Sequence, residues 1–254
     1  MAERSTWLSR MFARPRNKPA VPEDERIYAV GDIHGRADLL EKMLGLIWAD
    51  AAGPAQNTLV FLGDYIDRGP SSQEVIEILA TLERPDWTLI KLRGNHEQLL
   101  LDFLSKPDVY RVWRTFGGAE TLQSYGVRPP LFDDDVEYAR ARDELMSRLP
   151  PRHFAFLTAL STSYAAGDYY FAHAGVRPGI ALDKQSPEDL MWIREDFLLS
   201  DRKLEKVVVH GHTPVERPAV RPNRIGVDTG AYATDCLTAA VFEGESCRFL
   251  STRG

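Results

Sequence analysis

The side chains of this sequence that could do chemistry are gathered in a few short stretches. Aspartate, histidine and asparagine stand close together in three of them: GDIHG (31–35), GDYIDRG (63–69) and GNHE (94–97). Two further stretches, HAG (173–175) and HGHTP (210–214), add histidines. Five of the six histidines of the chain lie in these five stretches. Such a concentration indicates one site assembled from several loops.

The donor types in these stretches point to metal chemistry. Carboxylate, imidazole and amide groups together suit a borderline divalent cation such as Mn, Fe, Zn or Co. An all-oxygen set would suit Ca or Mg instead. One aspartate can bridge two ions, and two ions about 3.5–4 Å apart can orient a water and hold a phosphoryl group for in-line attack. The residue types therefore predict a two-metal site for phosphoryl transfer.

The stretch GNHEQLL (94–100) also fits an ordinary helix start. In that interpretation Asn95 is the N-cap, and Glu97 lies at the positive end of the helix dipole. The other four stretches favour the chemical interpretation. In it Asn95 is a neutral oxygen ligand and His96 is an acid beside the metals.

Predicted strands must position these stretches. Three β-rich runs, RIYAV (26–30), TLVFL (58–62) and WTLIKL (87–92), each end at one of the stretches and are followed by a helical pattern. Three such units in succession indicate parallel pairing and an α/β fold. Loops beyond the carboxyl ends of the strands in an open α/β sheet converge on one crevice. The polar stretches should therefore meet there.

The strand pattern returns in the second half of the chain, at 169–172, 206–209 and 224–227. Residues 105–165 interrupt it, and their polar, mostly helical pattern predicts an excursion over one edge of a single domain, 26–254. Residues 237–242 and 247–250 predict a closing antiparallel hairpin.

That hairpin bears on the two cysteines. A tight turn at 243–245 would place Cys247 opposite Phe242 and leave Cys236 out of register for a disulfide. Two free thiols predict a reducing, cytoplasmic location. The apolar runs are too short for a transmembrane segment, and the N-terminus lacks the apolar core of a secretory signal.

Charge is unevenly distributed along the chain. Residues 1–20 carry +4, so the remainder carries −10 of the total of −6. An acidic body argues against nucleic acid as the main partner. Residues 1–25 predict a flexible basic tail. Because Trp7, Leu8, Met11 and Phe12 recur at helical spacing, the tail could also form a helix that contacts a membrane surface or a partner.

The five stretches, in this order and at this spacing, resemble the motif set of the calcineurin-like metallophosphoesterase superfamily. The resemblance is to the phosphoprotein phosphatase (PPP) type of serine/threonine phosphatase, particularly its bacterial and phage members. It extends from about Tyr28 to Phe242. It implies a central β-sandwich of mixed sheets flanked by helices, with a dinuclear metal centre at the carboxyl ends of the strands.

The resemblance also implies which residues hold the metals. One ion would be bound by Asp32, His34 and Asp64, and the other by Asp64, Asn95, His173 and His212. Pro214 stands where many members of the superfamily have a further histidine, so the first ion would keep an open, water-filled position. Two divalent ions are expected, with Mn²⁺ favoured and Fe, Zn or Co as alternatives.

The same resemblance makes His96 the general acid that protonates the departing serine or threonine oxygen. Asp67 would orient that imidazole and hold it protonated. A bridging hydroxide would attack in line, without a phosphoenzyme. Arg68 and Arg194 match the arginines that bind the phosphate, since a guanidinium fork fits two phosphoryl oxygens.

Other polar residues have more than one interpretation. Arg194 lies on a helical pattern, where an exposed salt bridge is the ordinary explanation. Asp228 and Tyr232 could line the pocket or form a turn. His210 has no role in the resemblance and could hydrogen-bond behind the ligands, whereas His153 is predicted at the surface or in packing.

The expected substrates are phosphoproteins or phosphopeptides. The alternative is symmetrical hydrolysis of dinucleoside tetraphosphates (Ap4A), which similar bacterial proteins perform on the same scaffold. Those proteins tend to read GNHD and to lack the second aspartate of GDxxDRG, so Glu97 and Asp67 favour the protein phosphatase. A nuclease is disfavoured by Pro214 and the acidic body. A non-catalytic phosphoprotein-binding module should have lost a ligand or the acid, and none is missing.

Overall fold

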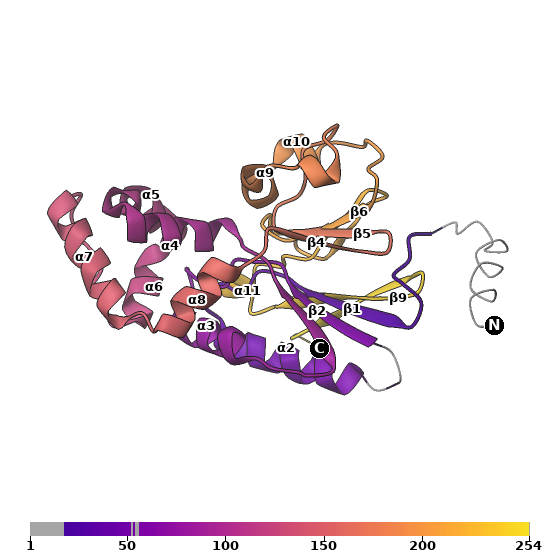
Figure 1. Ribbon diagram of the computed structural model, residues 1–254, viewed down its shortest axis with the longest axis horizontal. Helices are drawn as coiled ribbons and strands as arrows, with labels where there is room; N and C mark the ends of the chain where they lie inside the picture. The colour runs from indigo at the N-terminus through magenta and orange to yellow at the C-terminus, as the bar shows by residue number, and fades with distance from the viewer. Residues whose placement is uncertain (1–17, 52, 54–55, 254) are drawn as a thin grey trace, which may run out of the picture.

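The fold is a sandwich of two mixed sheets. The computed structural model describes residues 18–51, 53 and 56–253. In that part of the chain two five-stranded sheets face each other, with helices on the outer faces and at one end (Figure 1). The sandwich of mixed sheets implied by the resemblance is therefore confirmed. Residues 1–17, where the tail was predicted to carry helically spaced apolar residues, lie outside the described residues.

The first sheet has the strand order β10-β9-β1-β2-β3. Its strands are β1 (Glu25–Val30), β2 (Gln56–Phe61), β3 (Trp87–Lys91), β9 (Thr238–Glu243) and β10 (Ser246–Ser251). The first three pair in parallel, as predicted, and β9 and β10 form the antiparallel hairpin. Helices α2 (Ala37–Asp50) and α3 (Ser72–Thr81) connect the parallel strands. Each crossover leaves a loop between the end of a strand and the start of a helix, and the polar stretches occupy these loops.

The second sheet has the order β4-β5-β6-β8-β7. Its strands are β4 (Ser163–Ala166), β5 (Tyr169–Ala172), β6 (Val207–His210), β7 (Ala219–Val220) and β8 (Arg224–Gly226). Strands β5, β6 and β8 are parallel, as the sequence pattern suggested. The two short edge strands were not predicted, and β4 falls in the range expected to be mostly helical. Helices η3 (Leu182–Lys184), α9 (Pro187–Trp192), α10 (Glu195–Leu198) and α11 (Ala231–Thr234) complete this half.

Alternation along the strands divides the core into layers. In β1, Ile27 and Ala29 belong to the apolar cluster between the two sheets, whereas Tyr28 and Val30 belong to the cluster beneath α2 and α3. A third cluster, which includes Phe197, packs α9 and α10 on the outer face of the second sheet. Because both faces of the central strands are covered, these strands read as continuous apolar runs.

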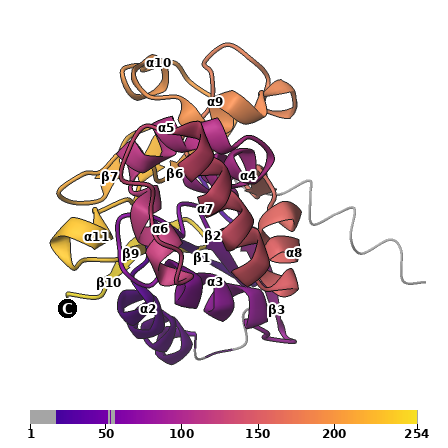
Figure 2. The same ribbon diagram turned by 90° about the vertical axis from the view of Figure 1, so that its left-hand side faces the viewer.

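A group of helices lies at one end of the sandwich. It comprises α4 (Asn95–Ser105), η1 (Pro107–Val109), α5 (Tyr110–Trp113), η2 (Arg114–Phe116), α6 (Gly118–Ser124), α7 (Asp135–Arg148) and α8 (Pro151–Ala159). Figure 2 looks onto this end, where α6, α7 and α8 lie in front of the first sheet. The helices thus enclose the side of the molecule on which the loops after β2 and β3 emerge.

The closing hairpin has the predicted register. Cys247 pairs with Phe242 across β10 and β9, and both cysteines are free thiols. Cys236 precedes β9 instead of lying in it. In the described part of the chain, no helix combines the length and the apolar character that crossing a membrane requires.

Candidate metal centre

Five strands deliver the predicted ligands to one place. Asp32 and His34 follow β1, Asp64 follows β2, Asn95 follows β3, His173 follows β5 and His212 follows β6. Each of these six side chains is at most 5% exposed. Burial of so many polar groups is costly unless they are paired or bind a cation, so their mutual contacts decide what the site can hold.

The first group of donors is formed by Asp64, His34 and His96. Oδ2 of Asp64 lies 3.6 Å from Nε2 of His34 and 3.6 Å from Nε2 of His96. Nδ1 of His34 contacts the carbonyl of Ile66 at 2.8 Å. A carbonyl only accepts, so this contact fixes the proton on Nδ1 and leaves Nε2 with a lone pair directed at the aspartate.

The second group of donors is formed by Asp64, His173 and His212. Nε2 of His173 lies 3.1 Å from Nδ1 of His212 and 3.3 Å from Oδ1 of Asp64. It also lies 3.0 Å from Oδ1 of Asn95. Because Nδ1 of His173 contacts the carbonyl of Leu62 at 3.0 Å, its proton belongs there. The lone pair on Nε2 therefore faces other lone-pair atoms, an arrangement that a bound cation stabilises.

Electrostatics keep these donors in the forms that bind metals. Burial lowers the pKa of His34 to about 3 and that of His212 to about 2, so both imidazoles are neutral near pH 7. Burial alone would raise the pKa of Asp64, but the neighbouring His173 and His96 hold it well below its usual value. Neutral imidazoles around an ionised carboxylate are the protonation states that metal ligation requires.

Two buried atoms have no hydrogen-bond partner in this centre: Nδ2 of Asn95 and Nε2 of His212. Native structures leave few such atoms unsatisfied, and functional sites are a common reason. The amide nitrogen of Asn95 is a donor and not a metal ligand, so the two cation sites are indicated by the two donor groups that share Asp64. The donors are consistent with a dinuclear centre.

Asp32 is placed differently from the other predicted ligands. Its oxygens accept the backbone N–H of His212, at 2.9 Å for Oδ2 and 3.2 Å for Oδ1. Burial, with the charges of Asp228 and Asp64, raises its pKa well above the usual value. Neither of the two donor groups includes Asp32, and His96 completes the first one instead.

Several residues in the loops that carry the predicted ligands have left-handed backbone conformations. His34, Asp64, Asp67, Arg68 and His212 all have positive φ angles, between 47° and 70°. They are five of the seven non-glycine residues with positive φ in the described ranges. Such conformations are costly for non-glycine residues and concentrate at functional sites.

Glu97 connects the loops after β2 and β3 through hydrogen bonds, a role that was not predicted from the sequence. It is fully buried, and its Oε2 accepts the backbone N–H groups of Gly94 and Asp64, each at 2.9 Å. Its Oε1 accepts the N–H of Tyr65 at 2.7 Å. Gly94, not Asn95, is the N-cap of α4. A Cβ atom at Gly94 would collide with Oδ1 of Asp64, so this glycine lets the loops after β2 and β3 approach each other.

His96, which belongs to the first donor group, also forms a unit with Asp67 and Arg68. Nδ1 of His96 lies 2.7 Å from Oδ2 of Asp67. Its Nε2 lies 3.4 Å from Nη2 of Arg68. Burial lowers the pKa of His96, but the charge of Asp64 and the hydrogen bond to Asp67 outweigh that effect and leave the pKa raised. Both ring nitrogens of His96 thus lie near charged groups. Nδ1 is next to the carboxylate of Asp67, and Nε2 is near the carboxylate of Asp64 and the guanidinium of Arg68.

Aromatic rings border this unit. Phe116 packs edge-on against His96 at 5.6 Å between ring centroids, and Trp192 packs against Phe116 at 5.8 Å. The guanidinium of Arg68 lies 4.7 Å from the centre of the Tyr232 ring. Tyr232, which sequence analysis considered as either pocket lining or turn, is therefore next to the unit.

The remaining predicted residues lie around the centre or away from it. Arg194 is exposed, and its Nη1 lies 3.5 Å from Oγ1 of Thr213, the residue after His212. His210 contacts the carbonyl of Gly211 at 3.0 Å. His153 is a packing residue, fully enclosed between Tyr125 and Glu77, far along the chain from the ligand stretches.

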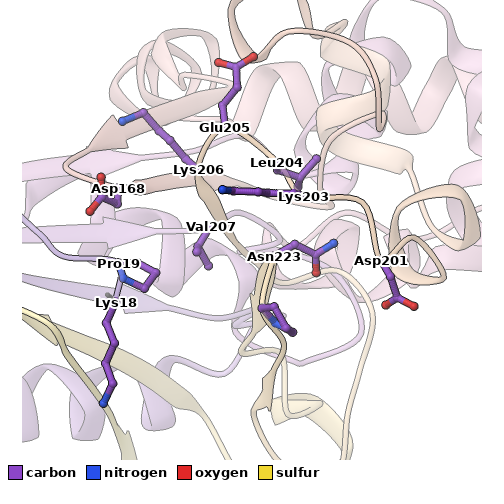
Figure 3. A pocket seen from close by; sticks show the side chains of 11 residues that line it. Lys18, Pro19, Asp168, Asp201, Lys203, Leu204, Glu205, Lys206, Val207 and Asn223 are labelled. Carbon is purple, nitrogen blue, oxygen red and sulfur yellow. The ribbon is translucent and has the colours of Figure 1, made fainter. Parts of the chain in front are cut away.

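A separate cavity of about 720 Å³ opens at the start of β6, the end of that strand opposite to His212 (Figure 3). Its charged lining residues are Lys18, Lys203 and Lys206 with Asp168, Asp201 and Glu205. The numbers of positive and negative groups match, and none of the predicted site residues lines this cavity.

Comparison with known proteins agrees with this geometry. The family model described as calcineurin-like phosphoesterase matches residues 25–239, which is most of the chain. The chain belongs to the calcineurin-like phosphoesterase family. It is therefore a metal-dependent phosphoesterase, and the two buried donor groups that share Asp64 are consistent with a dinuclear metal site.

Relatives within the calcineurin-like phosphoesterase family differ in substrate. Serine/threonine-protein phosphatase 1 of Salmonella typhimurium is 32% identical over 220 residues, covering 84% of this chain and 90% of its own. The asymmetrical bis(5'-nucleosyl)-tetraphosphatase PrpE of Anoxybacillus flavithermus is 27% identical over 234 residues, covering 83% and 87%. The crystal structure of a cold-active protein-tyrosine phosphatase from Shewanella superposes with a TM-score of 0.58 at 17% identity, covering 92% and 83%. The last similarity concerns the fold alone.

Proposed function

We propose that this phosphoesterase hydrolyses phosphomonoesters, and specifically phosphoserine and phosphothreonine in proteins. The observation that carries the proposal is the pair formed by His96 and Asp67, 2.7 Å apart and next to Asp64. A buried acid with its own orienting carboxylate is of most use when the leaving group is a poor one, such as a serine alkoxide.

The metal ligands in this proposal are Asp32, His34 and Asp64 for one ion and Asp64, Asn95, His173 and His212 for the other. The shared position of Asp64 and the neutral state of His34 and His212 support it. When bound, two divalent ions would activate a water for in-line attack and neutralise phosphoryl charge. Mn²⁺ is the metal we expect, and Fe, Zn and Co suit the same donors.

His96 would act as the general acid. Asp67 holds Nδ1, so Nε2 is the nitrogen that can give a proton to the departing oxygen as the P–O bond breaks. The raised pKa of His96 supports this, because it favours the protonated form before transfer.

Arg68 and Arg194 would bind the phosphoryl oxygens. Nη2 of Arg68 lies 3.4 Å from Nε2 of His96, which supports contact of both groups with one substrate. Nη1 of Arg194 lies 3.5 Å from Oγ1 of Thr213, the residue that follows His212. Two guanidinium groups suit the dianion of a phosphomonoester better than an internal phosphoanhydride.

A second candidate activity is hydrolysis of dinucleoside tetraphosphates. The similarity to the asymmetrical tetraphosphatase of Anoxybacillus flavithermus, over nearly as much of the chain as the similarity to the protein phosphatase, supports it. The symmetrical cleavage considered from sequence is the other form of this activity. Both candidates use the same metals and differ in the leaving group, which is a phosphate for the dinucleotide.

A direct comparison of substrates tests the proposal. The Mn²⁺-reconstituted protein is assayed with a phosphoseryl peptide, a phosphothreonyl peptide, a phosphotyrosyl peptide and diadenosine tetraphosphate. We expect kcat/KM to be highest for the seryl and threonyl peptides. A tenfold or greater preference for the dinucleotide would replace the proposal by the second candidate. The two free thiols support a reducing compartment, and we expect the phosphoprotein substrates to be cytoplasmic.

A further inference from the structure

The segment Trp113–Thr121 packs directly onto Asp67 and Arg68. Nε1 of Trp113, the last residue of α5, donates a hydrogen bond of 2.7 Å to Oδ2 of Asp67. The hydroxyl of Thr121, in α6, donates one of 2.5 Å to Oδ1 of the same carboxylate. Asp67, Trp113 and Thr121 are all fully buried. Both carboxylate oxygens are therefore held by the helical group, in addition to the contact with His96.

The same segment also holds the backbone on either side of this carboxylate. Oγ1 of Thr121 accepts the N–H of Asp67 at 2.9 Å, and the carbonyl of Gly117 accepts the N–H of Arg68 at 3.2 Å. Gly117 has a φ of 95°, and a Cβ atom there would lie 2.6 Å from the nitrogen of Arg68. The close approach requires glycine, so the segment is shaped to fit the Asp67–Arg68 loop.

We propose that Trp113 and Thr121 are positioning residues for the general acid. They fix the rotation of the Asp67 carboxylate, which in turn aims Nε2 of His96. This inference rests on the proposed role of His96. It makes the helical group part of the catalytic apparatus in addition to being a cover over one end of the sandwich.

These hydrogen bonds restrict rotation of the Asp67 carboxylate. A carboxylate with one hydrogen-bond partner can turn about its terminal bond, which is a soft torsion. Donors at both oxygens of Asp67 remove that freedom, and hydrogen bonds to an ionised acceptor are the strong ones. Since small misplacements of a catalytic group reduce rates sharply, loss of either donor should act on kcat through His96.

Matched variants test the proposal. Trp113→Phe removes the indole N–H but keeps an aromatic ring, and Thr121→Val removes the hydroxyl but keeps the shape. Complete loss of a general acid costs about 10²–10⁴-fold, so each variant should lower kcat for a phosphoseryl peptide by about tenfold or more, with KM changed by less than about twofold. For nitrophenyl phosphate, whose leaving group needs less protonation, kcat should fall by less than about threefold. Thr121→Ser should recover most of the activity.

A double-mutant cycle distinguishes a positioning role of Trp113 from a general loss of structure. In a His96→Asn background, Trp113→Phe should lower kcat no further, because residues that act through one group are not additive. Trp48→Phe is the control, since Trp48 packs on Trp87 away from the centre. A direct readout is the indole N–H resonance of Trp113, which should shift in Asp67→Asn while that of Trp48 does not.

Defined outcomes would overturn the inference. It fails if Trp113→Phe lowers kcat equally for both substrates, if the loss persists in the His96→Asn background, or if the indole resonance stays unchanged in Asp67→Asn. Failure of the proposed acid is a different result, in which His96→Asn itself leaves the leaving-group dependence unchanged. If His96→Asn alters that dependence and Trp113→Phe does not, only the inference about Trp113 is wrong.

Discussion

Nε2 of His173 lies 3.1 Å from Nδ1 of His212, so two imidazoles face each other through ring nitrogens beside Asp64. The carbonyl of Leu62 takes the proton of His173 at the opposite nitrogen, and burial keeps His212 neutral with a pKa of about 2. Imidazole nitrogens this close to each other and to the Asp64 carboxylate are placed to bind one cation together.

Removal of metal should therefore abolish activity. We expect chelation to eliminate phosphatase activity and Mn²⁺ to restore it, because the two donor groups that share Asp64 consist of side chains that bind such cations. Metal should also raise the melting temperature, since it binds only the folded state. Activity assays, elemental analysis and thermal scans of the same sample provide the measurement. Full activity in a sample shown to be metal-free would refute the two-metal interpretation.

Asp64→Asn should be the most damaging substitution of a ligand. Oδ1 of Asp64 faces the second donor group and Oδ2 faces the first, so this residue alone belongs to both. We expect the variant to lose more bound metal than Asp32→Asn, as measured by elemental analysis after dialysis. Asp143→Asn, on the exposed surface of α7, is the control and should retain full metal content. A larger loss in Asp32→Asn would mean that Asp64 is not the bridging residue.

His96→Asn separates an acid from a ligand. We expect unchanged metal content and a fall in kcat of about 10²–10⁴-fold for a phosphoseryl peptide. The fall should be smaller for nitrophenyl phosphate, because its leaving group needs less protonation. The measurement matters because Nε2 of His96 is also only 3.6 Å from Oδ2 of Asp64. A clear loss of metal from this variant would show that His96 is a ligand.

Glu97→Gln should reduce the stability of the fold around the centre. The carboxylate accepts four backbone N–H groups, from Gly94, Asp64, Tyr65 and Ile66. An amide can satisfy fewer of them, and an unsatisfied buried donor costs about 1–3 kcal/mol. Urea unfolding should show a loss of this size, whereas Glu137→Gln on the surface of α7 should change the free energy of unfolding by less than about 0.5 kcal/mol. Equal stability of the two variants would mean that Glu97 does not hold the loops.

Runs of apolar and β-branched residues correctly predicted the strands in which such runs are clear. The buried strands β1, β2, β5 and β6 and the partly exposed edge strand β3 were predicted from β-rich runs, and the polar stretches after them meet at one centre. The edge strands β4 and β7 were missed because they are only four and two residues long. No propensity predicts the left-handed backbone of Asp64 either, because the tertiary structure imposes it.

The contacts of Asp67 show why other residues of the site could not be predicted from the sequence. Trp113 and Thr121 lie 46 and 54 positions away along the chain, and only the docking of the helices against the loop after β2 brings them to the carboxylate. The pattern of residues 105–165 predicted helices, but helical periodicity does not say which polar atoms a helix will donate to. Glu97 is a similar case, since its position in the first turn of α4 suggested only a favourable dipole interaction.

Asp67→Asn should distinguish the two candidate substrates. A seryl phosphoester breaks to an alkoxide-like leaving group, so its hydrolysis depends on the proton that His96 supplies, and on Asp67 to hold that imidazole at 2.7 Å. The leaving group of a dinucleoside tetraphosphate is the phosphate end of a nucleotide, which departs with little help from an acid. We therefore expect Asp67→Asn to lower kcat/KM for a phosphoseryl peptide by about tenfold more than for diadenosine tetraphosphate. Metal content, measured on the same preparation, should stay at the wild-type value, because Asp67 belongs to neither donor group. An equal loss on both substrates would mean that the His96–Asp67 pair serves the structure of the centre and not protonation of the leaving group, and the assignment as a protein phosphatase would lose the observation that carries it.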